Sequence, residues 1–198
     1  MERKSAVETL LAIKRHWRYS DLEKLPEDGT LYEILKGELI VKGTPSRAHQ
    51  WTSMELVTRL FFHVKEHNLG QVYSAPFGVI LDAESEDPET GVIADIVYIS
   101  RERLGILTDM EVRGAPDLIV EILSPSTEDV DRNKKWKTYA ERGVAHYWIV
   151  DPVSRTLEAY HLQEDIFELA TLLNADDLFE PALFPGLAIP LAEIWYPR

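Results

Sequence analysis

A single carboxylate, Glu121, stands inside an otherwise apolar run of this sequence. The run reads LIVEIL, and its β-branched and aliphatic residues predict a buried strand over residues 117–123. A charge buried in such a strand without a partner is costly, so we expect Glu121 to face a cleft, a metal ion or a cation. The helix predicted over residues 131–142 supplies cations, and Lys135 is the one we expect to point back toward Glu121.

Asp95 repeats this pattern in a second apolar run, VIADIVYI, over residues 92–99. If the two strands are neighbours, Asp95 and Glu121 converge at one edge of the sheet, where they repel unless a cation neutralises them. Carboxylate oxygens suit Mg²⁺ or Mn²⁺, and such an ion polarises a phosphodiester and activates water. We expect Lys135 to orient or deprotonate that water, or to neutralise the pentacovalent phosphate.

Two further residues are candidates for the same site. Glu38 follows a predicted hairpin turn at Lys36-Gly37 and is a candidate metal ligand or base. His49 lies in the first turn of a helix predicted over residues 47–67 and is a candidate substrate ligand or proton relay. Simpler alternatives stay open: isolated strand carboxylates are often paired or at strand ends, a glutamate after a turn is usually exposed, and first-turn histidines usually cap or pack.

Composition narrows the class of protein. The chain has 198 residues, a net charge of −13 and no cysteine, which indicates one domain without disulfides or thiolate metal sites. The negative charge disfavours a sequence-tolerant DNA coat protein more than a metal-dependent enzyme, because a bound cation inverts the local field. The apolar part of the N-terminus is too short for a secretory signal, and no apolar run could cross a membrane. We expect a cytoplasmic protein without membrane contact.

The order of the predicted elements indicates an α/β fold with a mixed central β-sheet flanked by helices. Helices are expected over residues 1–18, 47–67 and 131–142, with short helical turns near residues 20–23 and 101–104. Strands are expected over residues 32–41 as a hairpin, 72–81 with a bend at 76–78, 92–99, 117–123, 145–150, 156–161 and 166–172. Residues 179–195 are expected to pack across the sheet.

Four motifs, in this order, resemble the Uma2 family of restriction-type endonucleases, within the PD-(D/E)XK nuclease superfamily. They are GELIVKGTPSRAHQ, IADIVYIS, GAPDLIVEILSPST and DRNKKWKTYAERGVAHYWIVDP, and the resemblance covers residues 31–162. It implies a restriction-endonuclease-like core (31–162), preceded by a helical arm (1–30) and followed by a packing extension (163–198). It also implies Mg²⁺-dependent cleavage of nucleic acid.

The resemblance also assigns roles to residues of this chain. It places Asp95 and Glu121 as the motif acids, which bind the metal, and Glu38 as the glutamate of the early element. The family's DRxxK pattern falls on residues 131–135, which makes Arg132 a substrate-binding candidate beside His49 and makes Lys135 catalytic.

The sequence departs from the superfamily pattern at two positions. Ala94 stands where many members have proline, and Leu123 stands where the superfamily lysine is expected. In this chain that lysine appears on the following helix, as Lys135.

The sequence is compatible with three functions. The first is a metal-dependent endonuclease acting on DNA, which we expect to form a homodimer because cutting a duplex requires two strands to be cut. The second is a catalytically silent nucleic-acid or protein interaction module of the same fold. The third is a metal-dependent phosphohydrolase acting on a small molecule.

Overall fold

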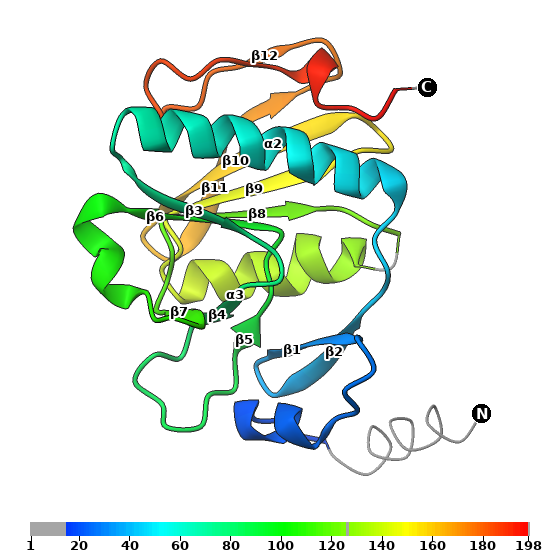
Figure 1. Cartoon of the computed structure of the whole chain (residues 1–198), viewed down its shortest axis with the longest axis vertical. Coiled ribbons are helices and arrows are strands. Elements are labelled where there is room, and N and C mark those ends of the chain that lie inside the picture. The colour runs from blue at the N-terminus through cyan, green and yellow to red at the C-terminus, as the bar shows by residue number, and fades with distance from the viewer. Residues whose placement is uncertain (1–14, 126, 198) are drawn as a thin grey trace.

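A six-stranded mixed β-sheet forms the centre of the computed structural model, which describes residues 15–125 and 127–197 (Figure 1). The strand order is β11-β10-β9-β8-β6-β3, and β8 and β9 run parallel while the other neighbours are antiparallel. The strands are β3 (Gly70–Ser74), β6 (Ile96–Ser100), β8 (Leu118–Ile122), β9 (His146–Asp151), β10 (Thr156–Gln163) and β11 (Ile166–Leu173). The predicted mixed sheet is confirmed, whereas the helix expected over residues 1–18 lies largely outside the described residues.

A smaller five-stranded sheet, of order β2-β1-β5-β4-β7, lies beside it. Its strands are β1 (Leu31–Leu35), β2 (Glu38–Lys42), β4 (Gly78–Ile80), β5 (Gly91–Val92) and β7 (Glu111–Arg113). The β1–β2 hairpin turns at Lys36 and Gly37, whose φ angles of 51° and 78° belong to the left-handed region that such a turn requires. A two-stranded sheet near the C-terminus pairs β12 (Leu178–Phe179) with β13 (Ile189–Pro190).

Two helices cover opposite faces of the six-stranded sheet (Figure 1). The first is α2 (Arg47–Glu66), where the Ser46 hydroxyl caps the start by accepting a hydrogen bond from the His49 backbone N–H at 3.1 Å. On the other face, α3 (Trp136–Glu141) continues a π-helical turn, η3 (Val130–Lys135). Short 3₁₀ helices are η1 (Tyr19–Lys24), η2 (Arg101–Ile106) and η4 (Leu191–Glu193).

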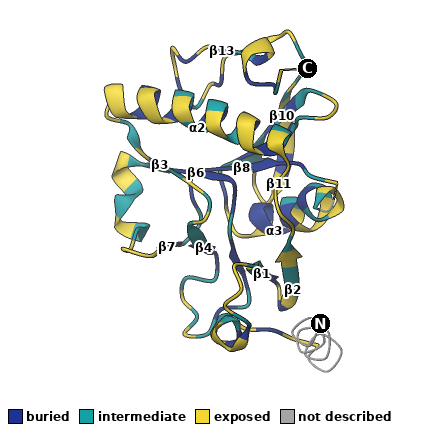
Figure 2. Cartoon of the chain, turned by 45° about the vertical axis from the view of Figure 1, so that its right-hand side comes forward, coloured by how far each residue is buried: buried dark blue, intermediate teal, exposed yellow. Residues whose placement is uncertain are grey.

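Alternation along the central strands divides the core into two layers. The layer toward α2 and the C-terminal segment contains Tyr98, Val120 and Trp148. The layer toward α3 contains the residue that directly precedes each of them, namely Val97, Ile119 and Tyr147. Figure 2 shows β6 and β8 buried between these layers, with the outer face of α2 exposed. A polar side chain on either strand is therefore shielded from water unless it lies at a strand end or a cavity.

The predicted elements differ from the structure where the backbone changes sheet. Residues 72–81 form two strands, β3 and β4, which belong to different sheets, rather than one bent strand. Residues 92–99 divide into β5 and β6, so Asp95 lies in the break just before β6 and not inside a strand. The helix predicted over residues 131–142 begins as a wider π-helical turn, and β7 lies within a segment predicted as a connection. Within the described residues, no helix is both long and apolar enough to cross a membrane.

We expect Phe184→Ala to lower the free energy of unfolding by about 3–5 kcal/mol, because truncating a buried aromatic side chain leaves a cavity. Phe184 is fully buried, with ring centroids 4.8 Å from Tyr98 and 6.1 Å from Trp148. Urea unfolding followed by tryptophan fluorescence measures the change.

The matched control is Phe62→Ala on α2, whose side chain is 63% exposed and whose loss should change stability by at most about 0.5 kcal/mol. Equal effects of the two substitutions would show that the C-terminal segment adds nothing to the core.

Candidate active site

Glu121 lies on β8, Asp95 lies just before the adjacent strand β6, and the two side chains face the same side of the sheet. Ile96 of β6 pairs with Val120 of β8, so the positions of Asp95 and Glu121 lie opposite each other in the extended register. Both carboxylates are buried, at 5% and 1% exposure, and both line a cavity of about 150 Å³. The convergence predicted from the sequence is therefore present in the structure, although the catalytic roles stay predictions.

The carboxylate of Glu121 is held by two donors from the helix behind it. Its Oε1 lies 2.9 Å from the Lys135 Nζ and accepts a hydrogen bond from the Tyr139 hydroxyl at 2.8 Å. Burial raises the pKa of Tyr139 well above its ordinary value, so the hydroxyl remains a donor. Lys135 thus reaches Glu121 from η3, the π-helical turn that follows β8, as the sequence predicted.

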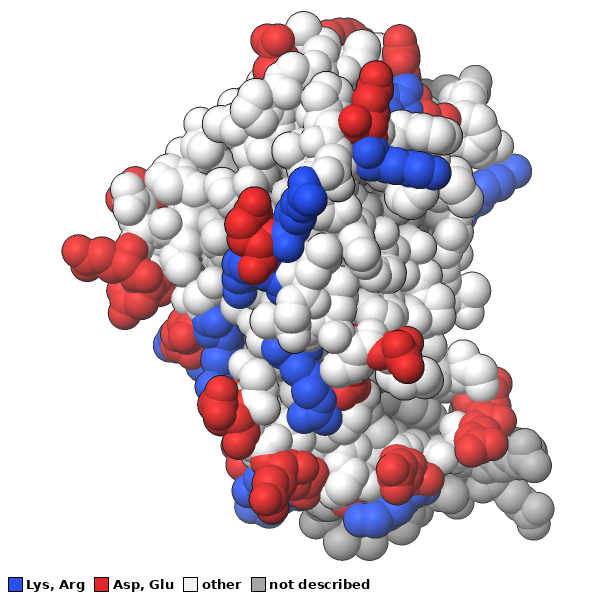
Figure 3. Space-filling view, turned by 60° about the vertical axis from the view of Figure 1, so that its left-hand side comes forward, with Lys and Arg blue, Asp and Glu red and all other residues white. Residues whose placement is uncertain are grey.

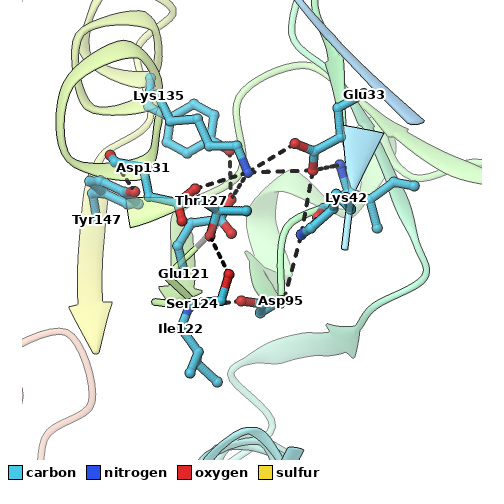
Figure 4. A network of polar contacts seen from close by, with 12 residues as sticks. Glu33, Lys42, Asp95, Glu121, Ile122, Ser124, Thr127, Asp131, Lys135 and Tyr147 are labelled. Carbon is cyan, nitrogen blue, oxygen red and sulfur yellow. Dashed lines mark hydrogen bonds and ion pairs between the residues drawn. The ribbon is translucent and has the colours of Figure 1, made fainter. Parts of the chain in front are cut away.

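Lys135 lies at the centre of a buried ion cluster (Figure 4). Besides Glu121, its Nζ lies 3.1 Å from Glu33 Oε2 and 3.3 Å from Asp131 Oδ1, and its side chain is only 1% exposed. The attraction of these carboxylates raises the pKa of Lys135 well above its ordinary value despite burial, so the ammonium stays charged.

The carboxylate of Asp95 has a different set of contacts. Its Oδ2 accepts a hydrogen bond from the Ile122 backbone N–H at 2.7 Å and lies 3.2 Å from the His49 Nε2, while its Oδ1 lies 3.7 Å from the Lys42 Nζ. Burial opposes ionisation, but the hydrogen bond with His49 and the charge of Lys42 hold the pKa of Asp95 below its ordinary value. His49, chosen from the sequence, therefore contacts the site at the first turn of α2.

Two members of this cluster, Glu33 and Lys42, were missed in the sequence. Glu33 is fully buried on β1, and its Oε1 accepts a hydrogen bond from the Ile93 backbone N–H at 2.9 Å. The signal that could have found it is the one used for Glu121, namely a lone carboxylate inside a short apolar strand. Lys42 ends β2 and gave no such signal, because a lysine at a strand end is ordinarily solvated.

The structure does not bring Glu38 into the cluster. Its side chain is 56% exposed and its carboxylate pairs with Lys134 at 2.6 Å. Glu38 starts β2 whereas Lys42 ends it, and four residues along a strand span roughly 13 Å. The early-element glutamate that reaches the site is Glu33, so the role expected for Glu38 has no support in the geometry.

Arg132 also points elsewhere. Its guanidinium pairs with Glu158 at 2.6 Å and with Glu128 at 3.2 Å. The contact with Glu158 ties the π-helical turn to β10, and none of these three side chains lines the cavity.

Acidic groups outnumber basic groups in the cluster. Among the described residues, four carboxyl groups (Glu33, Asp95, Glu121 and Asp131) face two ammonium groups (Lys42 and Lys135). Burial raises the pKa of Glu121 to about 8, since desolvation outweighs the attraction of the lysines and the other carboxylates add repulsion. Glu121 therefore holds a proton at neutral pH, and a divalent cation bound beside Glu121 and Asp95 would displace it and balance the two carboxylates.

The donor set suits Mg²⁺ or Mn²⁺, which keep water ligands, better than an ion whose ligands are all protein side chains. No group of three or more His, Cys, Asp or Glu side chains in the described parts of the chain is arranged to hold a metal. Mg²⁺ typically takes one or two carboxylates and fills its remaining positions with water and substrate phosphate. Asp95 and Glu121, which line one cavity, supply that number.

The chain shares its mixed α/β fold with a solved structure. A crystal structure described as "a putative nuclease belonging to DUF820" from Anabaena variabilis ATCC 29413 superposes with a TM-score of 0.72. The superposition covers 90% of this chain and 97% of that one, at 21% sequence identity, which establishes the shared fold alone.

The chain belongs to the Uma2 family. The model of that family, described as "Putative restriction endonuclease", matches residues 19–192. A protein of Synechocystis sp. (strain ATCC 27184 / PCC 6803 / Kazusa), described as "Uncharacterized protein slr1290", is 38% identical over 66 residues. That match covers 33% of this chain and 35% of the relative, so this chain spans about a third of the relative's length.

We expect Lys135→Met to lower the free energy of unfolding by about 3–5 kcal/mol, because it leaves buried carboxylates without their cation. Lys134→Met is the matched control in the neighbouring position. The exposed ion pair between Lys134 and Glu38 should contribute at most about 1 kcal/mol to the free energy of unfolding.

Thermal or urea unfolding of both variants, under the same buffer and without added divalent ions, gives the comparison. Similar losses in the two variants would contradict the central role of the buried ammonium.

Proposed function

We propose that this protein is a divalent-metal-dependent endonuclease that hydrolyses phosphodiester bonds of DNA. The observation that carries the proposal is the pair of buried carboxylates, Asp95 and Glu121, which face one cavity beside two ammonium groups. Family membership supports the reaction class. The metal, the preference for DNA and the residue roles are part of the proposal.

Asp95 and Glu121 would hold Mg²⁺ or Mn²⁺, which on binding polarises the phosphate and lowers the pKa of a water ligand. The protein holds both carboxylates in place beforehand. The Ile122 backbone N–H and His49 fix Asp95, and Lys135 and Tyr139 fix Glu121. Preorganised donors of this kind need little rearrangement during the reaction. In this proposal Lys135 is a positioning residue.

The reaction consumes one water molecule. Its oxygen forms a bond to phosphorus with its own electron pair, and the bond from phosphorus to the leaving ester oxygen breaks with its pair. The leaving oxygen gains a proton, and the products are a phosphomonoester and an alcohol. His49 lines the cavity and is the residue we propose to contact the substrate beside the metal.

Affinity for DNA would arise mainly at the site, because the chain as a whole is acidic. The net charge is −13, and on the face shown in Figure 3 basic and acidic side chains lie side by side rather than in separate patches. A small number of phosphate contacts predicts a shallow dependence of binding on salt. We also propose a homodimer, on the ground that two sites are needed to cut both strands of a duplex.

We expect Mn²⁺ to stabilise the wild-type protein, because it would bind the buried carboxylate pair in the folded state and not in the unfolded chain. At a free concentration one hundred times the dissociation constant, a single site adds about 2.7 kcal/mol. Calorimetric titration and thermal unfolding measure binding without any substrate. Asp95→Asn should abolish the stabilisation, whereas Glu102→Gln, an exposed control on η2, should retain it.

Wild-type protein should nick supercoiled plasmid DNA with Mg²⁺ or Mn²⁺ and lose this activity in EDTA. Asp95→Asn and Glu121→Gln should each lower the rate by at least about a hundredfold, since each removes a charged metal ligand. Far-UV circular dichroism of the variants must show the wild-type fold.

Two outcomes would point to other functions. Metal binding without DNA cleavage, but with hydrolysis of a small phosphodiester such as bis-p-nitrophenyl phosphate, would favour a small-molecule phosphohydrolase. Absence of both metal binding and cleavage would favour a silent interaction module.

A further inference from the structure

Two lysines lie near the paired carboxylates, and they differ in access to the cavity. Lys135 is 1% exposed, lies outside the cavity lining and is surrounded by Glu33, Glu121 and Asp131 at 2.9–3.3 Å. A substrate phosphate could reach its ammonium only by displacing a buried carboxylate. Lys135 is therefore poorly placed to contact a substrate.

Lys42 has the access that Lys135 lacks. Its side chain is 14% exposed and lines the cavity with Asp95 and Glu121, and no other lysine or arginine of the described residues does so. Figure 4 shows it between Glu33 and Asp95, on the opposite side of the cluster from the helix that carries Lys135. A phosphate between the carboxylate pair and β2 would meet this ammonium first.

The ammonium of Lys42 also has donors to spare. It donates one short hydrogen bond, to the Ile93 carbonyl at 2.8 Å. The nearest oxygens of Glu33 and Asp95 lie at 3.5 Å and 3.7 Å, which is longer than an ordinary hydrogen bond. Because an ammonium has three N–H donors, this arrangement anchors Lys42 while leaving it able to bind an anion in the cavity.

The hairpin explains why a residue so far in sequence from the acidic motifs reaches them. Lys42 pairs with Leu31 across the β1–β2 hairpin, and Glu33 pairs with Ile40 on the same face. The interactions of Glu33 with Lys135 and Ile93 tie β1 to η3 and to the segment between β5 and β6, and this fixes the end of β2 as well. Lys42 is thereby positioned by rigid elements on both sides.

We propose that Lys42, rather than Lys135, is the catalytic lysine of this protein and that its ammonium binds a non-bridging oxygen of the scissile phosphate. This inference rests on the proposed nuclease function. The ammonium donates hydrogen bonds and opposes the negative charge that builds on phosphorus oxygens during attack by water, and it neither gains nor loses a proton. The carboxylates Glu121, Glu33 and Asp95 raise the pKa of Lys42 although burial opposes them, which keeps it charged.

The absence of cysteine from the chain allows a direct test. Lys42→Cys introduces a unique thiol at the cavity, and alkylation with 2-bromoethylamine converts it to the γ-thia analogue of lysine, which restores the ammonium. The rate of plasmid nicking is measured under single-turnover conditions with Mn²⁺, before and after alkylation. Lys137→Cys, at a 72% exposed lysine of α3, is the matched control.

We expect Lys42→Cys to lower the rate by about a hundred- to a thousandfold, the loss typical for removal of one transition-state donor. Alkylation should recover at least a tenth of the wild-type rate, and Mn²⁺ binding should persist throughout. The control should keep the wild-type rate in both states. Should Lys42→Cys fail to fold, Lys42→Gln replaces it, and the same loss of rate with retained Mn²⁺ binding is expected.

The results separate this inference from the proposed function. A wild-type protein that does not cut DNA overturns the nuclease proposal and the role of Lys42 with it. A wild-type protein that cuts, together with a Lys42 variant of undiminished rate or one that full alkylation does not restore, overturns the role of Lys42 alone.

Discussion

A buried ammonium, Lys135 Nζ, is the contact on which the rest of the site depends. It lies within 3.3 Å of carboxylates from β1, β8 and the π-helical turn. Desolvating any one of these charges is costly, so each is tolerable only while the others are in place. The cluster therefore ties the smaller sheet, the central sheet and the helix into one arrangement, and a shift of any of these elements would leave a charge without its partner.

The same cluster accounts for two irregular features of the fold. The π-helical turn widens the start of the helix where Asp131 and Lys135, four residues apart, are both buried and paired. The break before β6 places Asp95 where the Ile122 backbone N–H can donate to its side chain, while its own backbone carbonyl accepts from Ala75. Irregular backbone of this kind is frequently found where side chains must be aimed at a functional site.

The sequence predicted well what depends on local pattern. Apolar runs identified the strand that carries Glu121 and the segment that carries Asp95, and capping chemistry identified the helix that carries His49. It failed for Glu33 and Lys42, because their burial is decided by how the hairpin packs against the segment that joins β5 to β6, a contact between segments about sixty residues apart in the chain. Glu38 shows the same limit. It is a glutamate on the same face of β2 as Lys42, but it lies at the opposite end of the strand, where it pairs with Lys134 in solvent.

An acidic protein that acts on an anionic substrate needs a local reversal of its overall charge, and the cluster explains how this would arise. Lys135 compensates the inner carboxylates without reaching the cavity, so the field that a substrate meets is set by Asp95, Glu121 and Lys42. Without a metal, the charge of Asp95 offsets that of Lys42, and the rim offers phosphate no net attraction. A divalent ion on the carboxylate pair would turn the rim into a cationic site that includes Lys42. Metal binding would then control not only the chemistry but also the admission of substrate, which a broad basic surface could not do.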